Sequence, residues 1–235
     1  MRTHERVLAQ IEADLAAGRW SLGERLPGER ALAEQLGVSR PSVREAIRIL
    51  EAMGIIRTAV GSGPDAGATV VDRPAAGLGA AVRLHVATGT LPVGDLVETR
   101  TLMETWAVGH AAAIRAADDY PELLEEAERL LKEMDDPDLE RGEFIERDQL
   151  FHLLLVRLAG NQLVEAIMSG LRGAVGSYVG AGAEHVPHWP TTTARLCTEH
   201  RAVLDAVRAG ESDKAVQLLR DHIEGFYRET GLAEA

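Results

Sequence analysis

The C-terminal half of the chain contains four side chains of the types that bind divalent transition metals, namely Asp148, His152, His200 and His222. Asp148 and His152 are four residues apart, so they share one face if their segment is a helix. His200 and His222 lie in two later segments whose apolar residues also repeat with helical spacing. Three imidazoles and one carboxylate could close a tetrahedral zinc site, or leave positions open on an octahedral metal such as nickel or manganese.

The segment around Asp148 and His152 is apolar nearly all round, which predicts that both side chains are buried. A buried carboxylate needs a partner, and a single buried histidine is more often hydrogen-bonded than bound to a metal. Four candidates on three segments favour a metal, with zinc as the first choice, provided that the three helices converge.

Short helices and a hairpin must position a second set of polar residues in the N-terminal third. Helical patterns cover 3–18, 29–36 and 39–53, and strand patterns cover 55–60 and 68–71. A tight turn at 37–38 joins the second helix to the third. This order of elements is that of a winged helix-turn-helix.

The third helix of this head carries donors suited to the major groove of double-stranded DNA. Arg40 and Arg44 are four residues apart and lie off its apolar stripe, and arginine commonly forks onto guanine. Arg30, in the preceding helix, is placed for a phosphate or base contact, and Ser39 and Ser42 can bind phosphate. An isolated arginine-rich helix would more simply face solvent, but the complete motif favours DNA binding.

Beyond 72–77, which we predict to be a linker, the chain shows only helical patterns. These cover 78–88, 93–117, 120–134, 139–159, 161–180, 190–209 and 212–229. Short connections between them predict antiparallel neighbours in a bundle. The expected fold is therefore mainly α, with a winged helix-turn-helix at 1–71 and an all-α antiparallel helical bundle at 78–235. The fifth of these helical segments and the two residues after it contain glycines at 170, 173, 176, 180 and 182, which is unusual for a helix.

Charge is distributed unevenly over these two parts. The net charge of −12 argues against nucleic acid at first sight, but residues 1–71 contain nine arginines and nine acidic residues and are neutral. An acidic body with a neutral, arginine-bearing head is compatible with local DNA binding. A single cysteine, no signal-peptide pattern and no long apolar run predict a cytoplasmic protein without a membrane span.

The stretch from Leu26 to Ile47 (LPGERALAEQLGVSRPSVREAI) closely resembles the head of GntR-type bacterial transcription regulators. The C-terminal part resembles the FCD-type effector domain of the FadR subfamily in Glu98-Thr99-Arg100, Glu104, Asp148, His152, Ala159-Gly160-Asn161, Glu199-His200 and His222. The resemblance covers nearly the whole chain. It implies a homodimer on a palindromic operator, a metal held by one Asp and three His, and a small organic acid effector beside that metal.

Two residues take their interpretation from this resemblance. Taken alone, Arg100 reads as a surface partner of Glu98 or Glu104, whereas the resemblance favours a bidentate clamp on the effector carboxylate. Gly63 is the expected DNA contact of the wing. The turn at 61–67 is longer than the family pattern and carries Asp65, which weakens the case for minor-groove contact.

Together these features predict a ligand-responsive transcription regulator. Repression that the effector relieves is favoured over activation. Two other interpretations use the same residues. One is a metal-dependent enzyme fused to a DNA-binding head, for which Glu199 beside His200 would be the candidate base. The other is a regulator whose metal only stabilises the bundle.

Overall fold

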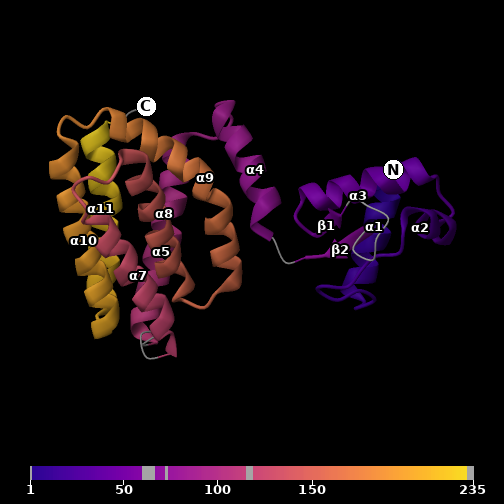
Figure 1. The fold of residues 1–235 in the computed structure, drawn as a ribbon, viewed down its shortest axis with the longest axis horizontal. Helices are drawn as coiled ribbons and strands as arrows, with labels where there is room; N and C mark the ends of the chain where they lie inside the picture. Colours follow the sequence, from indigo (N-terminus) through magenta and orange to yellow (C-terminus); the bar gives the residue numbers. More distant parts are fainter. Residues whose placement is uncertain (1, 60–66, 72–73, 115–118, 232–235) are drawn as a thin grey trace. The chain divides into compact units, whose positions relative to one another are not determined.

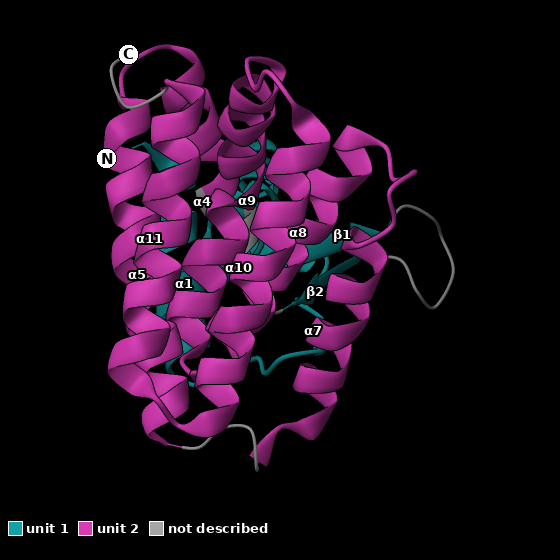
Figure 2. Ribbon diagram, turned by 90° about the vertical axis from the view of Figure 1, so that its left-hand side faces the viewer, with its two compact units in different colours: residues 1–78 teal, residues 79–235 magenta. Residues whose placement is uncertain are grey.

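The computed structural model describes residues 2–59, 67–71, 74–114 and 119–231, and the chain divides into two compact units, Met1–Leu78 and Gly79–Ala235 (Figure 2). The first unit contains α1 (Thr3–Ala16), α2 (Glu29–Leu36), α3 (Arg40–Ala52), β1 (Ile56–Ala59) and β2 (Gly67–Val70) (Figure 1). The predicted wing contact, Gly63, lies outside the described residues.

An apolar core joins the three helices of the first unit to its hairpin. Val7 of α1, Leu32 of α2, Val43 of α3 and Ile56 of β1 are all buried in it. The two strands are antiparallel, with Ile56 opposite Val70. Because the apolar stripe of α3 faces this core, its arginines are left on the exposed side.

The second unit is a bundle of long helices (Figures 1 and 2). They are α4 (Pro74–Ala87, which begins in the first unit), α5 (Val93–Ala113), α7 (Pro121–Met134), α8 (Arg141–Arg157), α9 (Gln162–Glu184), α10 (Trp189–Ala209) and α11 (Ser212–Thr230). Helix α5 packs against α8, α9, α10 and α11. The predicted mainly helical fold is confirmed. Among the described helices, none combines the length and apolarity needed to cross a membrane.

One helix differs from what the sequence patterns predict, and one that the glycines make unusual is present as predicted. Helix α4 begins at Pro74, inside the range 72–77 predicted as a linker, because proline fits the first turn of a helix and alanines favour its continuation. The glycine-rich segment forms a helix of 23 residues. Close neighbours pack against this helix: a Cβ on Gly79 of α4 would lie 2.2 Å from the backbone oxygen of Gly170, and one on Gly176 would lie 2.4 Å from Gln149.

Candidate metal centre and DNA-binding face

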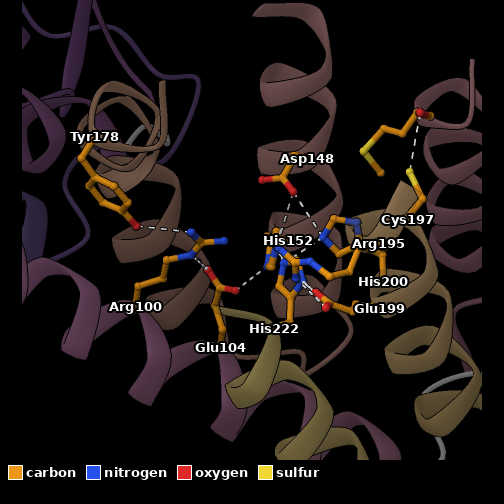
Figure 3. A network of polar contacts seen from close by, with 11 residues as sticks. Arg100, Glu104, Asp148, His152, Tyr178, Arg195, Cys197, Glu199, His200 and His222 are labelled. Carbon is orange, nitrogen blue, oxygen red and sulfur yellow. Dashed lines mark hydrogen bonds and ion pairs between the residues drawn. The ribbon is translucent and has the colours of Figure 1, made fainter. Parts of the chain in front are cut away.

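Three helices bring the four metal-type side chains together in the interior of the bundle (Figure 3). Helix α8 supplies Asp148 and His152, α10 supplies His200, and α11 supplies His222. All four are buried, and one potential ligand atom of each lies within 4.8 Å of the others. Asp148 Oδ1 is 3.2 Å from His200 Nε2, and His222 Nε2 is 3.0 Å from His200 Nε2 and 3.3 Å from His152 Nε2. The convergence on which the metal prediction depended is therefore present.

The electrostatics of this cluster suit a cation. Burial lowers the pKa of His222 to about 3, with the neighbouring His200 adding to the effect, and burial also lowers the pKa of His200. Burial would raise the pKa of Asp148, but His152 and the hydrogen bond with His200 hold that pKa well below its usual range. Neutral imidazoles and an ionised carboxylate are the protonation states that metal binding requires.

Two carboxylates outside the cluster orient its imidazoles. Glu104 Oε2 of α5 lies 2.5 Å from His152 Nδ1, and Glu199 Oε2 of α10 lies 2.8 Å from His222 Nδ1. Hydrogen bonds of this kind fix the tautomer and turn the other ring nitrogen toward a metal. Within the described residues, Nδ1 of His200 is buried without a hydrogen-bond partner.

Neither supporting role was predicted from the sequence. Glu104 is 48 positions from His152 and had been considered only as a partner of Arg100. Glu199 immediately precedes His200 in the sequence, but its side chain contacts His222 and Arg195. With both oxygens engaged, Glu199 is poorly placed to act as the general base of an enzyme.

Arg100 is buried within the same network rather than exposed at the surface. Its Nε donates to Glu104 Oε1 at 2.8 Å, and its Nη1 donates to the Tyr178 hydroxyl at 3.3 Å. Burial alone would lower the pKa of Arg100, but Glu104 keeps it well above its ordinary value. The residue also lines a cavity of about 20 Å³ that reaches Asp148 and His222. A larger groove of about 570 Å³ lies between α5 and α11, but its lining contains none of the four metal-type residues.

The predicted DNA contacts of α2 and α3 lie on an exposed face of the first unit. Ser39 caps α3, and its Oγ is 2.9 Å from Ser42 Oγ. Arg44 donates through Nε and Nη2 to the carboxylate of Glu29, at 3.0 and 2.7 Å, and Arg40 Nη2 lies 3.9 Å from the same carboxylate. This role of Glu29 was not predicted from the sequence.

Arg30, the remaining described candidate on this face, extends into solvent. Its side chain is 82% exposed, and its Nε lies 3.8 Å from the carboxylate of Glu34. An arginine this exposed is free to reach a phosphate or a base edge without breaking a buried contact.

Comparison with known proteins agrees with both units. Residues 3–64 match the family of bacterial regulatory proteins called gntR, and residues 95–225 match the FCD domain. The chain belongs to the GntR family. It is a transcription regulator with an FCD effector-binding domain, and the families and relatives that it matches are transcription regulators, not enzymes.

Several relatives match this GntR regulator over most of its length. It is 31% identical over 226 residues to the regulator Mce2R of Mycobacterium tuberculosis, covering 94% of this chain and 88% of that protein. It is 26% identical over 221 residues to the Glc operon transcriptional activator of Escherichia coli, covering 93% and 85%. A solved structure of Streptococcus agalactiae GntR has the same fold, with a TM-score of 0.64 at 22% identity, over 99% of this chain and 100% of that one.

Proposed function

We propose that this regulator is a cytoplasmic repressor that binds a palindromic operator as a homodimer and releases it when a small organic acid binds in the FCD domain. The proposed contacts with double-stranded DNA are Arg30, Ser39, Arg40, Ser42, Arg44 and Gly63. The proposed ligands of a divalent transition metal, zinc in preference to nickel or manganese, are Asp148, His152, His200 and His222. The proposed effector-binding residue is Arg100.

The observation that carries this proposal is the buried convergence of three imidazoles and one carboxylate beside a buried arginine. Nδ1 of His152 and Nδ1 of His222 each donate to a carboxylate, so without a cation their Nε2 atoms face one another as acceptors at 3.3 Å. A divalent metal would bind all four ligand atoms and relieve that repulsion, and imidazole with carboxylate is a donor set that zinc accepts. When bound, the metal supplies positive charge for an incoming carboxylate.

Arg100 supports the effector part of the proposal. Its Nε and Nη1 are engaged, whereas its Nη2 has no hydrogen-bond partner among the described residues. The small cavity joins this guanidinium to Asp148 and His222, so a carboxylate entering there would meet both a cation and a planar donor.

The DNA-binding part of the proposal rests on the arrangement of α3. Glu29 occupies the Nε and Nη2 side of Arg44, which leaves the outer edge of that guanidinium, formed by Nη1 and Nη2, for a guanine. Arg44→Ala should therefore abolish the preference for the operator over random DNA. Unchanged sequence-specific binding by this variant would contradict the assignment.

The effector switch is tested with full-length protein of measured metal content. Fluorescence anisotropy of a labelled operator, with and without organic acids, should show effector-dependent release by the metal-loaded protein. His152→Ala with His200→Ala should remove the metal and abolish the response, while DNA binding persists. A metal-free wild-type protein that responds normally would refute the switch. A chelator that lowers stability but leaves the response intact would show that the metal is purely structural.

A further inference from the structure

The cavity beside the candidate metal centre is lined mostly by apolar side chains. Seven of its ten lining residues are apolar, and the other three are Arg100, Asp148 and His222. Three of the chain's nine aromatic residues meet there, namely Phe144, Trp189 and Phe226. No serine, threonine, asparagine, glutamine or lysine lies among the described residues of this lining.

From this lining we infer that the effector is a monocarboxylic acid with an apolar, preferably aromatic, body. The inference rests on the proposed function, because it places the effector carboxylate between Arg100 and the metal. The remainder of the ligand then lies against Phe144, Trp189 and Phe226. Trp189 acts as a lid that must move to admit it.

The apolar lining lowers the affinity for more hydrophilic acids. A hydroxyl or a second carboxylate on the ligand would lose its hydrogen bonds to water and find no partner in the aromatic part of the cavity. An unpaired buried polar group costs about 1–3 kcal/mol, which corresponds to roughly tenfold to a hundredfold in affinity. Acids with a hydroxyl or a second carboxylate at the end remote from the bound carboxylate should therefore bind more weakly than apolar acids of similar size.

The position of Trp189 makes it the movable wall. It is the first residue of α10 and is only partly buried, unlike Phe144 and Phe226. Its ring meets Phe144 edge-on, with 5.5 Å between ring centroids, and the guanidinium of Arg141 lies 5.0 Å from its centroid. The cavity of about 20 Å³ holds little more than one water, so this wall must move before the cavity can admit the apolar body of an acid.

Matched pairs of acids test the inference on the zinc-loaded full-length protein. Isothermal titration calorimetry should show phenylacetate binding at least about tenfold more tightly than 4-hydroxyphenylacetate, which differs only by one hydroxyl group, placed on the ring. Acetate and succinate complete the panel. In a Trp20→Phe, Trp106→Phe background, phenylacetate should change the fluorescence of Trp189, the one tryptophan left.

Variants test the role of the aromatic wall. Trp189→Ala should lower the ratio of phenylacetate affinity to acetate affinity about tenfold, because an aromatic contact is lost for phenylacetate alone. Trp106→Ala, on the exposed side of α5, should leave the ratio unchanged and serves as the matched control.

The possible outcomes separate this inference from the proposed function. If 4-hydroxyphenylacetate or succinate binds as tightly as phenylacetate, or if Trp189→Ala leaves the ratio unchanged, the inference is wrong while the carboxylate site stands. If no acid binds the zinc-loaded protein, or if binding survives His200→Ala and Arg100→Gln unchanged, the proposed effector site itself fails and the inference fails with it.

Discussion

Glu104→Gln should lower the metal affinity of the candidate centre without replacing any of its four proposed ligands. The carboxylate of Glu104 lies 2.5 Å from His152 Nδ1, and both side chains are at least 96% buried. The neighbouring Arg100 and His152 outweigh burial and lower the pKa of Glu104 to about 2, so the group is ionised at neutral pH. Loss of such a supporting carboxylate typically costs about tenfold to a hundredfold in metal affinity. We expect a loss near the upper end, since water cannot replace the partner.

Glu199→Gln is the matched comparison. Glu199 supports His222 at 2.8 Å, but its side chain is 30% exposed, so water can partly take over its role. We therefore expect a loss of metal affinity near the lower, tenfold end of the range. Zinc affinity is measured for both variants by competition with a chromogenic chelator.

Stability must be measured separately for Glu104→Gln, because the same change leaves Arg100 buried without its carboxylate. Removing one member of a buried ion pair costs about 3–5 kcal/mol, and urea unfolding of the metal-free protein should show that loss. The reasoning is refuted if folded Glu104→Gln protein binds zinc as tightly as wild type, or if Glu199→Gln loses more affinity than Glu104→Gln does.

Three further predictions concern other parts of the molecule. Glu29→Gln should free Arg44 for phosphate, tightening binding to random DNA more than to the operator in salt-dependent anisotropy titrations; an unchanged affinity ratio would contradict this. Burial raises the pKa of Cys197 to about 12. The native thiol should thus react far more slowly with iodoacetamide at pH 8 than the thiol of the protein unfolded in urea. The free energy of unfolding should fall as the pH rises above about 9, because the thiol then ionises in the unfolded chain but not in the folded one. Gly79→Ala should destabilise the protein by about 1–3 kcal/mol through a clash with the α9 backbone, whereas Gly94→Ala, with open space around it, should not; equal melting temperatures would argue against that contact.

The sequence identified the four metal-type residues that converge, but not the carboxylates around them. Helical spacing placed Asp148 and His152 on one face of α8, and residue type identified His200 and His222. The support from Glu104 could not be predicted in the same way. It depends on the way α5 packs against α8, and no local pattern encodes a contact over 48 positions.

Tertiary packing also accounts for the glycines in and around α9. Intrinsic propensity counts each glycine of a helix as unfavourable, but a Cβ on Gly176 would meet Gln149, and a Cβ on Gly79 would meet the backbone of Gly170. On α3 the arginines were found from the local motif, whereas the ion pair between Glu29 and Arg44 spans 15 positions and two helices. Tertiary packing therefore decided what local patterns left open.

The closed cavity gives the proposed effector a physical way to act. A ligand shifts an equilibrium only by binding one state more tightly than another. At about 20 Å³ the cavity has no room for the apolar body of the proposed acid, so that acid binds only the state in which the cavity is open. If that state were about 1% populated, the apparent affinity would be about a hundredfold weaker than the intrinsic one, and saturating ligand would reverse the populations. Because Trp189 belongs to α10, which also carries His200, opening the cavity would displace a helix that holds the proposed metal, and that links effector entry to rearrangement of the bundle.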